Sequence, residues 1–192
     1  LCTFRARRLG EEKFRQVFQN IVRQCIDKGL VKGQRQIIDS THIIADMAVM
    51  SLTGLLKLCR YNLLKTVEKQ DTKLAEKLGL EEMKFSSQDK FTRRKDNLEE
   101  EIEQAGSLLD GVSRELKNSR LKVTPELQKD LGLLEKVVAD RDEEAKDRLV
   151  SPVDAEARTG NKQHKHWVGY KGHLIVEEES EIITAVETTP GN

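Results

Sequence analysis

Asp39, Ser40 and Thr41 place a carboxylate and two hydroxyls inside a run of β-branched residues, QIIDSTHIIADMA (residues 36–48). Isoleucine and threonine at this density favour a short strand. A carboxylate in such a strand is expensive to bury unless it is hydrogen-bonded or bound to a metal ion. The stretch by itself leaves two interpretations open. Asp39 either caps or turns the chain, or it is a metal-binding aspartate on a strand.

Basic residues gather in two parts of the chain, where they could contact the phosphates of a nucleic acid. Residues 1–36 hold nine Lys and Arg against three acids. The densest part of this first group is Arg5, Arg7, Arg8, Lys13 and Arg15. The second group is Lys162, Lys165 and Lys171. For both groups, an ordinary solvated charged surface is the alternative.

Apolar periodicity predicts the elements that position these residues. Residues 11–28 place five apolar side chains on one helical face, and Gly29 is expected to end that helix. Residues 52–70 carry a second such face, and residues 72–78 a short helix before Gly79. The strand around Asp39 lies between the first two helices.

Two further segments, residues 98–116 and 125–145, repeat apolar residues at alternating steps of four and three. Thr124 is expected to cap the second helix, with Pro125 at its first position. Two such helices joined by a short loop predict an antiparallel, coiled-coil-like hairpin. The acidic runs of both segments are expected to be solvated. A homodimer interface on the apolar stripes is the open alternative.

The last part of the chain predicts a second β region. Residues 151–166 have the composition of a polar loop, and residues 167–176 and 181–189 alternate as the strands of a β-hairpin. The sequence therefore predicts a predominantly helical α+β fold. Its parts are a helical segment (1–35), a first strand (36–50), a helical insertion (51–150), and a basic loop with a hairpin in the same sheet (151–192).

Composition narrows the class of protein. Charged residues make up 34% and aromatic residues 4% of the chain, and the formal net charge is zero. This balance is typical of a helix-rich protein with a modest core. Three separated cysteines without a CxxC pair indicate a reducing compartment. Residues 1–20 lack a signal-peptide core, and Asp46 and Lys57 interrupt the most apolar stretch. We therefore expect a cytoplasmic protein without a membrane span.

Four segments, in family order, resemble the transposases of bacterial insertion sequences. They are TFRARRLGEEKF, QIIDSTHIIADMA, SPVDAEARTGNK and HWVGYKGHLIVEEESEIITAVETTPGN. The helical block is less diagnostic. The resemblance implies a ribonuclease-H-like catalytic domain with an Asp-Asp-Glu triad that uses Mg²⁺ or Mn²⁺. It also implies cleavage at transposon ends, attack of the freed 3′-hydroxyl on target DNA, work on paired ends, and association with the bacterial nucleoid.

The resemblance assigns Asp39 to the first carboxylate of the triad, as a catalytic and metal-binding residue. The family's second aspartate follows the segment that matches TTPGN, and its glutamate comes later, so both are expected past Asn192. Asp154 matches a different family feature. If the strand continues, Asp46 lies on its opposite face. We therefore expect no catalysis by this chain alone. A non-catalytic helical interaction module is the alternative function, which the heptads and the neutral charge favour.

Overall fold

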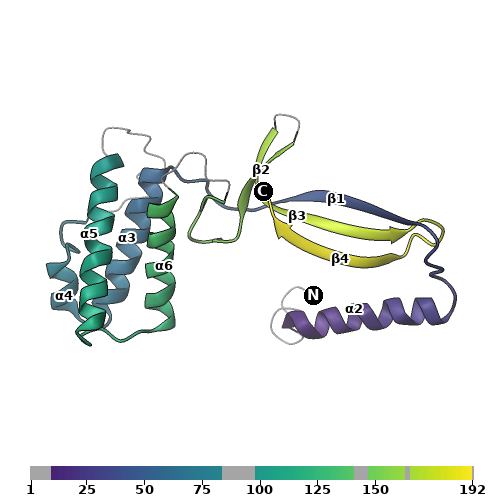
Figure 1. Cartoon of the computed structure of the whole chain (residues 1–192), viewed down its shortest axis with the longest axis horizontal. Helices are drawn as coiled ribbons and strands as arrows, with labels where there is room; N and C mark the ends of the chain where they lie inside the picture. The colour runs from purple at the N-terminus through teal and green to yellow at the C-terminus, as the bar shows by residue number, and fades with distance from the viewer. Residues whose placement is uncertain (1–9, 84–97, 141–146, 163–164, 192) are drawn as a thin grey trace. The chain divides into compact units, whose positions relative to one another are not determined.

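The structure is a computed structural model that describes residues 10–83, 98–140, 147–162 and 165–191. About half of these residues are helical, and the remainder includes an antiparallel four-stranded sheet. The elements, in chain order, are α2 (Gly10–Asp27), β1 (Gln36–Ile44), α3 (Leu52–Glu68), α4 (Thr72–Lys77), α5 (Leu98–Lys117), α6 (Pro125–Ala139), β2 (Arg158–Lys162), β3 (Lys165–Glu177) and β4 (Ile183–Pro190) (Figure 1). The predicted α+β class is confirmed.

The chain divides into two compact units. One contains residues 10–43 and 171–189, and the other contains residues 44–170 with 190 and 191. The division falls inside β3, so this strand contributes to both units. Among the described helices, none combines the length and the apolar character that a membrane crossing requires.

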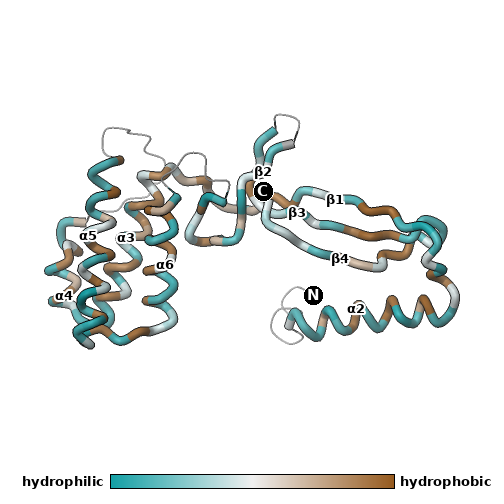
Figure 2. The backbone as a smooth tube through the Cα atoms, viewed as in Figure 1, coloured by the Kyte–Doolittle hydropathy of each residue, from teal (hydrophilic) through white to brown (hydrophobic). Residues whose placement is uncertain are grey.

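The larger unit is built around α3, which contacts α4, α5 and α6. Apolar positions recur along these helices (Figure 2). Its core includes side chains with no exposed surface, among them Leu56, Leu63, Val112 and Leu134. Cys59 is a free thiol in this core, and its burial raises its pKa to about 12. The thiol is therefore un-ionised at neutral pH.

The helix boundaries follow local signals in the sequence. The Thr124 hydroxyl accepts a hydrogen bond from Leu127 N at 3.2 Å, and Pro125 opens α6, as predicted. Gly29 adopts a φ of 68° just past α2, a left-handed conformation that glycine adopts at low cost. The Asp71 carboxylate caps α4 in the same manner as Thr124, by accepting from Leu74 N at 2.9 Å.

The periodic stripes of α5 and α6 face α3 as well as each other. Ala105 and Val112 of α5 and Leu127 and Leu134 of α6 are buried in one cluster with α3 side chains. The two helices therefore form part of a bundle, and the coiled-coil description is not confirmed. Since these stripe residues are buried inside the unit, a homodimer through the insertion stays a prediction that the burial does not support.

β3 is the central strand of the sheet. It pairs with β1, with β4 and, antiparallel, with β2, in a register that places Arg158 opposite Gly169 and Lys162 opposite Lys165. Hydrogen bonds from Ala45 N to Val168 O (3.0 Å) and from Glu178 N to Arg35 O (3.1 Å) bracket the β1–β3 ladder. Counting inward from both ends places Asp39 opposite Leu174 and Ser40 opposite His173.

β2 is a correction to the sequence analysis, which expects a loop over residues 151–166. Arg158–Lys162 contains residues of low strand propensity, so its composition gave no strand signal. Pairing with β3 stabilises β2 despite this composition, because Gly160 of β2 packs against the ring of Trp167 of β3. A Cβ atom built on Gly160 would meet Trp167 Cζ2 at 2.3 Å. Trp167 thus packs within the β2–β3 ribbon.

Candidate functional site around Asp39

Asp39 lies in the middle of β1, with three residues of the strand before it and five after it. Its side chain is exposed, and its Oδ1 atom accepts a hydrogen bond from the backbone N–H of Ser40 at 2.8 Å. The turn or cap interpretation is wrong, since the backbone is extended on both sides. β1 ends at Ile44, before Asp46. Among the nine residues of β1, Asp39 is therefore the one with a carboxylate side chain.

The described neighbours of Asp39 on its face of the sheet are mostly apolar. Side chains of a strand alternate between faces, so Asp39 shares its face with Thr41 and Ile43. A Cβ atom built on Gly172 would lie 3.1 Å from Ile43 Cδ1 and 3.6 Å from Thr41 Cγ2, which places this part of β3 on the same face. Leu174 lies opposite Asp39. The exposed carboxylate thus has Leu174 opposite it and Thr41 as a polar neighbour on the same strand.

Asp39 fits a hard divalent cation as one oxygen ligand, because its carboxylate is exposed on a regular strand. Among the residues that the structure describes, no three His, Cys, Asp or Glu side chains lie close enough to hold a metal ion. These residues therefore provide one ligand and do not complete a metal centre.

An imidazole bridge crosses three strands on the opposite face. Ser40 Oγ lies 2.7 Å from His173 Nδ1, and His173 Nε2 lies 3.0 Å from Thr189 Oγ1. Ser40 belongs to β1, His173 to β3 and Thr189 to β4. Both ring nitrogens are therefore hydrogen-bonded to hydroxyls, which fixes the orientation of the ring. His173 was not among the site residues expected from the sequence, although a histidine within the apolar run HLIV is a signal that could have indicated it.

Hydrogen bonds to the Glu177 side chain link the segment before β1 to the end of β3. Glu177 is 2% exposed. Its Oε1 atom accepts from Gly33 N at 2.8 Å and from Lys32 N, and Ser180 Oγ donates to its Oε2 at 2.5 Å. These hydrogen bonds, with that from Ser180 the strongest influence, lower the pKa of Glu177. The ion pair of Lys32 with Glu179, at 2.9 Å, flanks this contact.

The hydrogen bonds of Lys32 and Gly33 to the Glu177 carboxylate are expected to weaken at acidic pH. A carboxylate with a lowered pKa stabilises the folded state above its unfolded value, and that contribution is lost as the pH falls through the folded value. We expect the amide proton shifts of Lys32 and Gly33 to be constant near neutral pH. They should move toward random-coil values below the ordinary glutamate pKa of 4.5.

A pH titration of these two amide shifts by NMR tests the expectation. Glu177→Gln should give shifted amides at neutral pH and remove most of the acid transition. Glu178→Gln is the matched control, because Glu178 is an exposed neighbour that pairs with Arg35. An unchanged acid transition in Glu177→Gln would show that another group governs the attachment.

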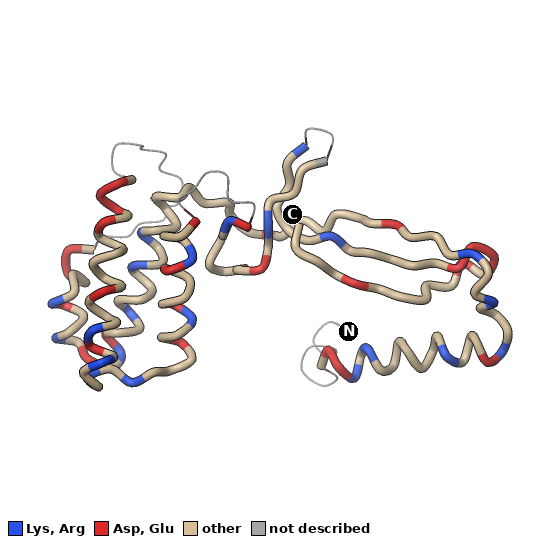
Figure 3. The backbone as a smooth tube through the Cα atoms, in the orientation of Figure 1, with Lys and Arg blue, Asp and Glu red and all other residues tan. Residues whose placement is uncertain are grey.

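The predicted phosphate-binding residues have different outcomes. Arg5, Arg7 and Arg8 lie outside the described residues. On α2, Lys13, Arg15 and Arg23 are balanced by three acids, so the helix is neutral (Figure 3). Lys165 is exposed at the start of β3, Lys162 lies opposite it in the register, and Lys171 is partly exposed further along β3. Of the second basic group, Lys165 is therefore exposed and Lys171 partly exposed on β3, and α2 provides no net positive charge.

Asp154 has a structural role. Its Oδ1 atom accepts from the hydroxyl of Tyr170 and from Ala157 N at 3.3 Å. The hydrogen bond to Asp154, together with burial, raises the pKa of Tyr170 to about 12. Arg158 donates in the same corner to Asp147 and to the carbonyl of Ala155. The segment around Asp154 is thus used to join β2 and β3 to the preceding turn.

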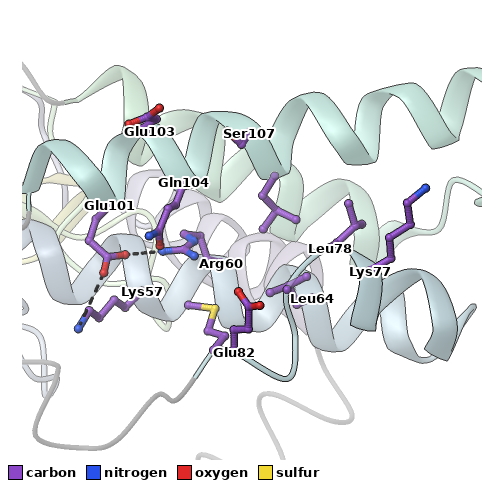
Figure 4. A pocket seen from close by; sticks show the side chains of 13 residues that line it. Lys57, Arg60, Leu64, Lys77, Leu78, Glu82, Glu101, Glu103, Gln104 and Ser107 are labelled. Atoms are coloured by element: carbon purple, nitrogen blue, oxygen red, sulfur yellow. Dashed lines mark hydrogen bonds and ion pairs between the residues drawn. The ribbon is translucent and has the colours of Figure 1, made fainter.

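The helical unit contains a pocket of about 680 Å³ beside α3 and α5 (Figure 4). Arg60 Nη1 donates to Glu101 Oε2 in its wall, and Lys57 Nζ lies 3.9 Å from Glu101 Oε1. Arg60 Nε is buried and has no hydrogen-bond partner within the described part of the chain. The ion pairs join two helices, and the lining residues carry equal numbers of acids and bases. The pocket therefore shows no preference for ligands of one charge.

Searches of the chain against protein families, curated proteins and solved structures find no match. The geometry around Asp39 is therefore the basis for the function proposed below.

Proposed function

We propose that the chain is a part of a DNA transposase that carries the first metal-binding aspartate of a ribonuclease-H-like catalytic domain. The observation that carries the proposal is the position of Asp39, mid-strand and exposed on β1, next to β3, which pairs with β4. An interaction module does not require a carboxylate at this position. Metal-dependent phosphoryl transfer needs carboxylates held on rigid elements.

The apolar surface of the sheet supports the same proposal. Ile37 and Ile43 on one face are 50% and 45% exposed, and Ile38 on the other face is 70% exposed. Antiparallel sheets with one solvated face normally alternate apolar and polar residues. Isoleucines on both faces are typical of a sheet that has layers on both sides, as in a ribonuclease-H-like domain. Further segments that bring the second aspartate and the glutamate would supply such layers.

The proposal assigns separate roles to the chain's residues. Asp39 is the first triad carboxylate and one ligand of Mg²⁺ or Mn²⁺ in the complete enzyme. Lys162, Lys165 and Lys171 contact DNA phosphates near the transposon ends, since a phosphate–lysine contact positions DNA without reading its sequence. By itself the chain binds the metal ion weakly, and it lacks the remaining carboxylates for cleavage. The helical insertion connects β1 to the later strands and has a hydrophobic core of its own.

DNA binding is expected to depend on salt. We expect the purified chain to bind duplex DNA in fluorescence anisotropy, with an affinity that falls as NaCl is raised from about 50 to 200 mM. Lys165→Glu should weaken binding to all sequences and lower the salt slope by about one. Lys129→Glu is the matched control, because Lys129 is an exposed lysine on α6 with no proposed DNA contact.

Two results would count against these contacts. An affinity that is insensitive to salt would exclude a phosphate-based interaction. An equal loss in Lys129→Glu and Lys165→Glu would show a general charge effect. Absence of DNA binding would favour the helical interaction module, for which the independent core of the larger unit is the supporting observation.

A further inference from the structure

We propose that His173 is a positioning residue that, through Ser40, fixes the direction of the Asp39 carboxylate. The inference rests on the proposed function, because only there does the direction of this carboxylate matter for a ligand. It concerns the imidazole bridge on the face of the sheet opposite Asp39. Three hydrogen bonds link the residues in sequence: Asp39 to Ser40, Ser40 to His173, and His173 to Thr189.

The backbone of β1 sets the direction of the Ser40 N–H. In the register set by the ladder, the N–H and C=O groups of Asp39 point toward β3. Those of Ser40 then point away from β3, toward the outer side of β1, which is an edge strand in the described sheet. The Ser40 N–H is thus available to the Asp39 carboxylate, and the two atoms lie 2.8 Å apart. The orientation of Ser40 therefore determines the position of Asp39 Oδ1.

The second step concerns the side chain of Ser40. An edge strand is held by hydrogen bonds on one side, so its residues twist more freely than those of a central strand. Ser40 Oγ and His173 Nδ1 lie 2.7 Å apart across a pair where the ladder has no backbone hydrogen bonds. A side-chain bond at this place limits rotation of Ser40, and hence of its N–H.

The third step concerns the rigidity of His173 itself. The ring is hydrogen-bonded at Nε2 to Thr189 Oγ1, 3.0 Å away on β4. One nitrogen of a neutral imidazole donates and the other accepts, and each hydroxyl can take either role. The ring is therefore held from both sides, between two strands that do not pair with each other. The positions of β3 and β4 therefore determine where the Ser40 side chain lies.

Two conservative substitutions separate this role from a general structural one. The amide group of asparagine occupies the place of Nδ1, and that of glutamine the place of Nε2. His173→Asn therefore keeps a partner for Ser40, and His173→Gln keeps a partner for Thr189. Both variants lose one hydrogen bond, so a merely structural role predicts similar effects for both. The positioning role predicts an effect in His173→Gln that His173→Asn does not show.

Hydrogen exchange of the Ser40 amide in the intact chain is the first readout, because this N–H is bonded to the carboxylate rather than to the ladder. We expect exchange about fivefold faster in His173→Gln and Ser40→Ala, and within about twofold of the parent chain in His173→Asn. Thr189→Val removes the same hydrogen bond as His173→Asn and should likewise stay within about twofold of the parent chain. Equal acceleration in His173→Asn and His173→Gln, or none in either, would overturn the proposal.

Mn²⁺ added alone provides a second readout, which distinguishes this inference from the proposed function. Paramagnetic broadening of the resonances around Asp39 in the parent chain, lost in Asp39→Asn, supports the metal role. Broadening that is reduced in His173→Gln and retained in His173→Asn supports positioning. If Mn²⁺ gives no broadening at Asp39, the metal role fails, and the exchange comparison still decides the positioning role. If broadening is the same in all His173 variants, the positioning role fails while the metal role stands.

Discussion

Leu63→Ala is expected to lower the free energy of unfolding of the helical unit by about 3 to 5 kcal/mol. Leu63 lies on α3, has no exposed surface, and belongs to the cluster that joins all four helices of the unit. Removal of its branched end loses the transfer free energy of the buried atoms and leaves a cavity that rigid neighbours fill only in part. Urea denaturation followed by far-UV circular dichroism measures the change.

Val123→Ala is the matched control for this experiment. Val123 lies between α5 and α6 in the same unit, and it is 72% exposed. Its truncation should change the free energy of unfolding by less than about 0.5 kcal/mol. A loss of under about 1 kcal/mol in Leu63→Ala would show that α3 is not the centre of the core. The described packing would then be wrong.

Glu101→Gln is expected to have the second large effect, a loss of about 3 kcal/mol in the same unfolding measurement. The Glu101 side chain is 11% exposed and that of Arg60 is 14% exposed. A neutral amide in place of the carboxylate leaves the Arg60 guanidinium buried without its counter-ion, and Lys57 loses its nearby charge as well. Removal of one partner of a buried ion pair is more destabilising than replacement of both.

The double variant Glu101→Leu with Arg60→Met distinguishes the two contributions. It removes both charges and supplies apolar side chains that fill part of the same space. We expect it to recover most of the stability that Glu101→Gln loses, since the unpaired buried charge is the main cost. A double variant as unstable as Glu101→Gln would indicate that the ion pair itself holds α3 against α5.

Local signals in the sequence predicted the helices well. The cap and proline pair at Thr124 and Pro125, the glycine at Gly29, and the apolar stripes act within one or two turns of a helix. Their outcome depends little on distant parts of the chain, so the observed bounds of α2, α3 and α5 lie close to the expected ones. The helix expected over 125–145 ends at Ala139, and residues 141–145 of that expectation lie outside the described residues. The β-branched run around Asp39 likewise predicted β1 correctly.

Contacts between distant residues decided the remainder. β2 forms because β3 lies beside it, and composition alone predicted a loop there. Ser40 and His173 are 133 positions apart in the chain, and Lys32 and Glu177 are 145 apart. No spacing rule connects residues at such distances. His173 and Glu177 make their contacts with such distant residues, so they were not identified from the sequence.

By itself, the sequence determined the strand tendency of the run around Asp39, the α+β class, and most of the helix boundaries. These properties follow from side-chain size, branching and capping over a few residues. Only the tertiary structure decided which side chains meet Asp39 and its neighbours. Strand pairing brings Leu174 opposite the carboxylate and His173 opposite Ser40, and a shift of one residue in that register would exchange the two faces of the sheet.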